Sequence, residues 1–93
     1  MVVAASIEDI KGKIGGIIET SANLKPSELI GRENEHLNKD LGIDSLTLLE
    51  IALSVDQEFG TDFSEEELLG MESIQKATDM VFARLESRKA AEA

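Results

Sequence analysis

Apolar side chains recur every three or four residues over the first third of this chain. Ser6 and Asp9 resemble a capping box, the side-chain pair that opens many helices. The sequence predicts a helix from there to about residues 21–23, weakened by Gly15 and Gly16. Its apolar positions are Ile7, Ile10, Ile14, Ile17 and Ile18.

Three further helices are predicted towards the C-terminus, each with its own cap. Asp44 is the expected N-cap of a helix that runs to about Phe59, with Gly60 as its C-terminal cap. Ser64 opens a short helix that stops at Gly70. Ser73 caps the last helix, for which we expect a buried stripe of Ile74, Ala77, Thr78, Val81 and Leu85.

Residues 24–43 lack a clear period and form a predicted long connection that carries the only proline, Pro26. Twenty residues without regular structure would be unusual in a compact domain. We therefore expect a short turn at residues 27–30. The side chains expected to pin this loop to the core are Leu24, Leu29, Ile30, Leu37 and Leu41.

Together these elements predict an all-α fold, a four-helix bundle of three longer helices and one short helix with a long loop between the first two helices. No segment shows the alternation of a strand, and no repeat or linker interrupts the pattern. We expect a single domain over residues 1–93. Its core would span about residues 6–86, and residues 87–93 would form a frayed tail.

The helix that starts after Asp44 has more apolar residues than one core stripe needs. At 100° per residue, Leu48, Ile51, Ala52, Val55 and Phe59 share the face expected to be buried. A second stripe lies on another face, flanked by acids; it could pack under the preceding loop or form a surface that partners bind. The second stripe and the acids beside it comprise Leu46, Leu49, Glu50, Leu53 and Asp56.

Composition narrows the classes of partner. The 93 residues include 19 Asp and Glu against 9 Lys and Arg, a formal net charge of −10. Nucleic acids and anionic membranes repel such a chain, whereas basic protein surfaces attract it. Cysteine is absent, so disulfides and thiolate metal sites are excluded. No apolar run approaches the length of a membrane span, and the apolar start at residues 1–5 lacks a basic region. We therefore expect a cytoplasmic protein without a signal peptide. We also expect a monomer.

The most informative motif is the octapeptide at residues 40–47, Asp-Leu-Gly-Ile-Asp-Ser-Leu-Thr. Its glycine turn places Asp44 and then Ser45 at the start of a helix, where backbone N–H groups and the helix dipole favour a phosphate. No base is available there to activate Ser45 as a nucleophile, and the only histidine, His36, is a poor catalytic candidate. An EF-hand is excluded because the order of calcium ligands is wrong, and we expect no metal site.

The motif, the helix after it and the acidic balance resemble the acyl carrier proteins over about residues 7–85. The resemblance implies a protein without catalytic activity that holds acyl groups as thioesters. Ser45 matches the serine that receives 4′-phosphopantetheine from coenzyme A, and Asp44 matches the aspartate that helps place the metal during that transfer. Leu46 matches a position contacted by partner enzymes, and Glu50 and Asp56 match acids that meet basic patches.

The resemblance also implies the partners, which are a phosphopantetheinyl transferase and acyl-loading or ketosynthase-type enzymes. Fatty acid and polyketide biosynthesis both remain open, because Asp-Ser-Leu-Thr at residues 44–47 is also similar to polyketide carriers. Two alternatives are retained. One is an aminoacyl or peptidyl carrier, and the other is a cofactor-free acidic adaptor that binds a basic protein.

Overall fold

The computed structural model describes residues 6–92, without the side chains of residues 89–92, and over that range it is entirely helical apart from loops. The apolar start at residues 1–5 and residue 93 lie outside the described residues. The α-helices are α1 (Ile7–Ala22), α2 (Ser45–Phe59), α3 (Glu65–Leu69) and α4 (Ile74–Glu92), and a 3-10 helix, η1 (Pro26–Glu28), lies in the long loop. The four-helix, all-α prediction is therefore confirmed.

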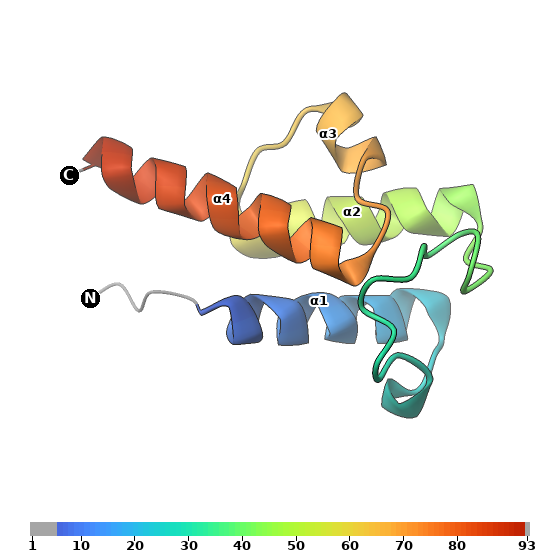
Figure 1. Ribbon diagram of the computed structural model, residues 1–93. Helices are drawn as coiled ribbons and strands as arrows, with labels where there is room; N and C mark the ends of the chain where they lie inside the picture. Colours follow the sequence, from blue (N-terminus) through green and yellow to red (C-terminus); the bar gives the residue numbers. More distant parts are fainter. Residues whose placement is uncertain (1–5, 93) are drawn as a thin grey trace.

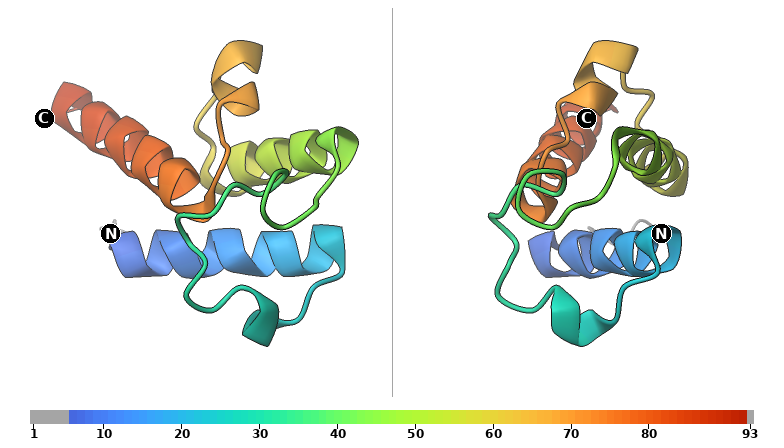
Figure 2. Two further views of the ribbon diagram at one scale, coloured as in Figure 1. Left: turned by 45° about the vertical axis from the view of Figure 1, so that its right-hand side comes forward. Right: turned by 90° about the vertical axis from the view of Figure 1, so that its right-hand side faces the viewer.

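The three long helices surround one core. α1 packs against both α2 and α4, and α2 runs antiparallel to α1 (Figure 1). Seen end-on, α1, α2 and α4 form a triangle, with α3 beyond α2 and α4, and η1 on the outer side of α1 (Figure 2). Fully buried residues from all three helices fill the centre, among them Ile10, Ile14, Ile18, Val55 and Val81.

The predicted caps are present at the helix starts. The Ser6 hydroxyl accepts a hydrogen bond from the backbone N–H of Asp9 at 3.1 Å. Ser64 and Glu67 form a complete capping box at the start of α3, and the Ser73 hydroxyl accepts from the N–H of Lys76. Such caps satisfy N–H groups that have no partner inside the helix. Because each cap joins residues that are three apart in the sequence, it can be predicted from the sequence alone.

The long loop passes from η1 to the start of α2 and is held by backbone contacts with the α3–α4 connection. The N–H of Leu37 donates to the carbonyl of Glu72 at 2.8 Å, and the N–H of Gln75 donates to the carbonyl of Glu33 at 2.9 Å. These bonds fix residues 33–37 beside residues 72–75, although the two segments are far apart in sequence. They bring the loop before α2 next to the end of α3.

Most of the predicted loop contacts are confirmed, but the prediction for Ile30 is wrong. Leu29 and Leu37 are buried, and Leu24 and Leu41 pack against the core, whereas Ile30 is 75% exposed. The turn predicted at residues 27–30 is confirmed, because the 3-10 helix Pro26–Glu28 is followed by a turn over residues 29–31. Ile30 is exposed because Leu29 occupies the inward position of this turn, so the next side chain points outward.

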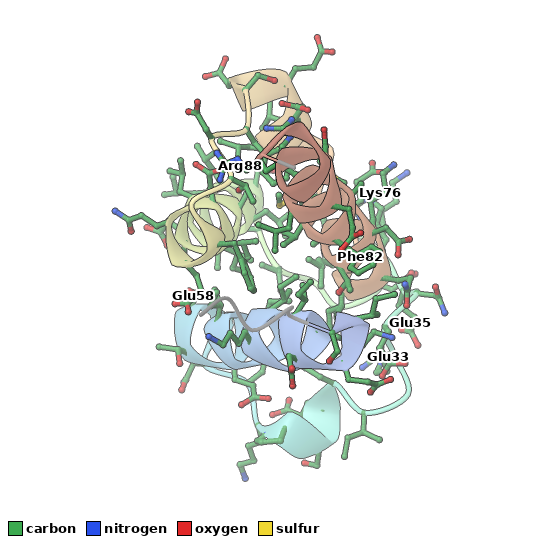
Figure 3. The ribbon with its side chains drawn as sticks, turned by 90° about the vertical axis from the view of Figure 1, so that its left-hand side faces the viewer. Glu33, Glu35, Glu58, Lys76, Phe82 and Arg88 are labelled. Atoms are coloured by element: carbon green, nitrogen blue, oxygen red, sulfur yellow. The ribbon has the colours of Figure 1, made fainter. Side chains whose placement is uncertain are left out.

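The predicted stripe of α4 is buried except for Leu85, which is only half-buried. Residues 87–93 were expected to fray, but the backbone of α4 remains helical through Glu92. One contact supports this extension: the Arg88 guanidinium donates to the carbonyl of Gly60, at the end of α2 (Figure 3). The last helix is therefore longer than the sequence indicated. The single domain over residues 1–93 remains a prediction.

Candidate functional site

The candidate site begins with the turn that precedes α2. Gly42 has a φ of +74°, a left-handed conformation that glycine adopts without steric cost. Asn38 supports the same turn, because its side-chain amide donates to the carbonyl of Ile43 at 2.8 Å. Ile43 itself is buried. The turn is therefore held from both sides, and it leaves the next two residues, Asp44 and Ser45, exposed at the start of α2.

Asp44 is the N-cap of α2, as predicted. Its Oδ1 accepts a hydrogen bond from the backbone N–H of Thr47 at 2.7 Å, and its carbonyl accepts from the N–H of Leu48. The hydrogen bond from Thr47 holds the pKa of the Asp44 carboxyl below its usual value. The carboxylate is therefore ionised at neutral pH, and its Oδ1 is committed to the helix end.

Ser45 is the first residue of α2, and its side chain is exposed. The N–H groups of Ser45 and Leu46 have no acceptor inside the helix, because they belong to its first turn. Donors at a helix N-terminus favour a phosphate on the adjacent hydroxyl. The site therefore fits a phosphodiester at the Ser45 Oγ.

A cavity of about 220 Å³ opens beside Ser45, between the start of α2 and the end of α3. Leu48, Leu49, Leu68, Leu69 and Met71 supply most of its apolar wall, and residues 36, 38 and 72 supply its polar wall. Sequence analysis did not foresee this cavity, and it dismissed His36. The residues that line it come from three segments of the chain with no shared period, so no sequence signal indicates it.

The second stripe of α2 does not pack as a unit under the loop. Leu46 is 70% exposed and Leu53 is 49% exposed, whereas Leu49 is half-buried at the cavity. Glu50 is exposed beside them. The stripe is therefore divided between an outward surface and the wall of the cavity. Which residues contact partner enzymes remains a prediction.

Asp56 differs from the other residues predicted to contact partners because its carboxylate accepts hydrogen bonds from within the protein. Its Oδ1 accepts from the Thr61 hydroxyl at 2.6 Å and from the backbone N–H of Phe63 at 2.8 Å. Partial burial opposes ionisation, but these hydrogen bonds outweigh it and lower the pKa of the Asp56 carboxyl. Asp56 thus holds the α2–α3 connection, a role that spacing along α2 did not indicate.

The negative charge of the chain is concentrated around this site. Residues 40–75, which include α2 and α3, contain ten Asp and Glu and no Lys or Arg, whereas the remaining residues contain nine of each sign. Glu50, Glu65 and Glu66 are exposed on these two helices. A field of one sign over this part of the molecule attracts basic partners and speeds their encounter.

Within residues 6–92, no three acidic or histidine side chains converge as a bound metal ion would require. None of the helices in the same range is both long and apolar enough to cross a membrane.

Comparison with known proteins agrees with this geometry. Residues 13–81 match the protein family described as "Phosphopantetheine attachment site". The chain is 33% identical to the acyl carrier protein of Coprothermobacter proteolyticus over 78 residues, which cover 84% of this chain and 93% of that protein. The chain belongs to the acyl carrier protein family. Phosphopantetheine is therefore its covalently attached prosthetic group, and the cofactor-free adaptor alternative is set aside.

Other members of the family are similar over a slightly shorter range. The acyl carrier protein of Rhodococcus erythropolis is 31% identical over 72 residues, covering 77% of each chain. The meromycolate extension acyl carrier protein of Mycolicibacterium aurum is 32% identical over 72 residues, covering 77% of this chain and 72% of that protein. These relatives include carriers named without a pathway and one named for meromycolate extension.

Proposed function

We propose that this member of the family carries acyl intermediates for fatty acid or polyketide biosynthesis as thioesters on a phosphopantetheine arm at Ser45. The observation that carries the proposal is the exposed Ser45 hydroxyl at the N-terminus of a 15-residue helix. Tethering raises the effective concentration of an acyl group at each successive enzyme without a new contact. The chain itself needs no catalytic residue for this role, and acts as a monomer in the cytoplasm.

The loading reaction defines what Ser45 must do. Its Oγ forms a bond to the phosphorus of the phosphopantetheine moiety of coenzyme A, the hydroxyl proton is released, and 3′,5′-adenosine diphosphate leaves. The open N–H groups of the first turn favour the charge of the resulting phosphodiester. We propose that a phosphopantetheinyl transferase supplies the base and the metal for this step, with Asp44 at the edge of the metal site.

Loading tests the attachment site directly. The chain is incubated with coenzyme A, Mg²⁺ and a broad-specificity transferase, and its intact mass is measured. We expect one added phosphopantetheine, none on Ser45→Ala, and normal loading of Ser27→Ala, which removes another exposed serine. Modification of Ser45→Ala, or no modification of the natural sequence, would contradict the proposal.

The partner surface that we propose consists of Leu46, Leu53 and Glu50. Both leucines are exposed, and the acid lies between them on α2. Partners would be the transferase and acyl-loading or ketosynthase-type enzymes with basic patches. Charges at a rim mainly speed encounter, whereas an apolar contact that becomes buried mainly slows release.

The two kinds of contact respond differently to salt. Glu50→Lys should slow the loading of Ser45 by a basic transferase at low ionic strength, and this defect should shrink as salt is added. Leu46→Ala should weaken binding with little dependence on salt. Glu86→Lys, which makes the same change of two charge units at an exposed position of α4, is the control for a general change of net charge. Equal effects of the two lysine variants would contradict a specific role for Glu50.

A further inference from the structure

A groove runs along the outer side of α1, where the loop that contains η1 and the start of α4 pass beside the helix. Its volume is about 290 Å³. It shares no lining residue with the cavity beside Ser45, and none of its lining residues belongs to α2. Figure 2 shows η1 on the outer side of α1 and α3 beyond α2 and α4. The proposed attachment site and partner surface on α2 therefore leave this groove unused.

The groove has an apolar floor and one exposed apolar side chain at its edge. Leu29 and Ile74 line it and are buried, whereas Ile30 lines it and is 75% exposed. Among the large hydrophobic side chains that the structure describes, Ile30 is the most exposed. A single exposed apolar residue is ordinary on a protein surface, but one at the edge of an apolar groove extends the surface that a partner can bury.

Two glycines form the α1 side of the groove, Gly12 and Gly15. Both lie inside a helix, where glycine is less favourable than alanine. A Cβ atom at either position would meet no atom within 4 Å, so packing inside the protein does not require glycine there. The absence of these two side chains leaves the backbone of α1 open to close approach by another chain.

Acidic side chains border the groove and indicate the chemistry of its partner. The charged residues that line it are three acids and one base, Glu8, Glu19, Glu33 and Lys11. Among the side chains that the structure describes, none of these three carboxylates takes part in an ion pair. A second copy of this chain, with its net charge of −10, would bring more negative charge to the same rim. A basic partner complements the rim instead.

We propose that this groove binds a basic amphipathic helix of a partner protein. Its apolar side chains lie over Gly12 and Gly15 and against Ile30, and its Lys or Arg side chains lie beside the acidic rim. Helices that bind in grooves present apolar side chains at such spacings of three and four residues. A helix rises about 1.5 Å per residue, so the stretch of α1 from Glu8 to Glu19 is roughly 16 Å long and accommodates about three turns of a partner helix.

Binding in this groove has a consequence for the carrier. Because no residue of α2 lines the groove, a helix bound there leaves the Ser45 hydroxyl exposed. One protein can then hold the chain by α1 while others act at Ser45. The binding itself does not depend on the proposed attachment of phosphopantetheine.

A titration with a synthetic peptide tests the groove. The probe is a helical peptide of about 18 residues, long enough to form a helix, with leucines three and four residues apart on one face and lysines beside them. Its control has glutamate in place of every lysine. In the isotope-labelled apo chain, we expect the lysine peptide to shift the amide signals of Gly12, Gly15 and Ile30, and the glutamate peptide to shift none of them. Shifts confined to α2 and α3, or equal shifts with both peptides, would overturn the proposal.

Three variants separate a direct contact from a general effect on the fold. Ile30→Ala should lower the affinity for the lysine peptide about tenfold, roughly the effect of burying two CH₂ groups. Leu53→Ala, which changes an exposed leucine outside the groove, should leave the affinity unchanged. Gly15→Ala should raise the melting temperature of the free chain, because alanine favours a helix, yet lower the affinity, because its methyl group keeps the peptide away from α1. Full affinity in both Ile30→Ala and Gly15→Ala would show that the peptide does not bind in the groove.

The loading reaction distinguishes this inference from the proposed function. With the lysine peptide at saturation, the transferase should load Ser45 at the rate that it shows without peptide. If saturating peptide blocks loading, the groove and the loading surface are not separate, and the inference is wrong while the carrier function stands. If Ser45 is not loaded in either case, the proposed function is wrong, whereas the peptide shifts in the apo chain still decide whether the groove binds a basic helix.

Discussion

The two ends of α2 are built differently. At its C-terminal end, Asp56 binds residues 61 and 63, and Arg84 of α4 donates to the Thr61 carbonyl and to Glu67, both at 2.8 Å. The Arg84 guanidinium also lies 4.6 Å from the ring centre of Phe63. At the N-terminal end, only a cap and a turn hold Ser45, and a cavity opens beside it.

This difference separates stability from function along one helix. The C-terminal end commits its polar groups to one another, so they are not available to a ligand. The N-terminal end leaves the Ser45 hydroxyl exposed beside a cavity. The modification that we propose at Ser45, and the proposed encounters with several enzymes, need such an open end. At the other end, the contacts of Arg84 with residues 61, 63 and 67 hold the α2–α3 connection in place.

The largest expected effect is at the C-terminal end. Phe63 is buried under Arg84, so Phe63→Ala should lower the free energy of unfolding by about 3–5 kcal/mol, as for other buried aromatic residues. Leu69→Ala, near the open end, should change it by less than about 0.5 kcal/mol because Leu69 is 65% exposed. Urea denaturation of both variants measures the contrast. Equal losses would show that the ends do not differ in this way.

Asp56→Ala should cost about 1–3 kcal/mol, because it leaves the Thr61 hydroxyl and the Phe63 N–H without their acceptor. Glu50→Ala, an exposed acid on the same helix, should change stability by no more than about 0.5 kcal/mol. The midpoint of urea unfolding is the measurement. If Asp56→Ala lowers the free energy of unfolding no more than Glu50→Ala does, the Thr61 hydroxyl and the Phe63 N–H have found other acceptors. Asp56 would then contribute no more to stability than an exposed acid.

The N-cap Asp44, at the N-terminal end of α2, should contribute less to stability than Asp56 does. Asp44→Ala removes the acceptor of the Thr47 N–H and should lower stability by about 1 kcal/mol, the usual value for an N-cap. Asp44→Ser, which retains a capping oxygen, should restore most of this loss and is the matched control. Loading of Ser45 in the same two variants shows whether the carboxylate has a further role. If Asp44→Ala lowers the free energy of unfolding as much as Asp56→Ala does, the N-terminal end of α2 is no less important for stability than the C-terminal end.

The smallest effect concerns pH. Hydrogen bonds lower the pKa of Asp56 in the folded state, so the unfolded chain binds more protons once the pH falls below the usual Asp value of about 3.9. The stability that Asp56 contributes is therefore present above that pH and is lost as the pH falls through its folded pKa. The difference in unfolding free energy between the natural sequence and Asp56→Ala should narrow below about pH 4. A difference that stays constant on acidification would contradict this assignment.

Local features of the fold could be predicted because their causes are local. Helix caps at Ser6, Asp44 and Ser64 join residues three apart, and the apolar period of each helix identifies its buried face. The exposed hydroxyl of Ser45 follows from the same reasoning. Ile30 was wrongly expected in the core because an aperiodic loop gives no indication of which of its two neighbouring apolar residues points inward.

The sequence by itself determined the helices, their caps, the acidic character of residues 40–75 and the position of Ser45 at a helix start. Only the tertiary structure decided that Asp56 holds the α2–α3 connection while Glu50, earlier on the same helix, remains on the surface. It also decided that His36 and Glu72 meet beside Ser45. The physical reason is that these contacts join segments separated by loops, and their geometry arises only when the helices pack around one core.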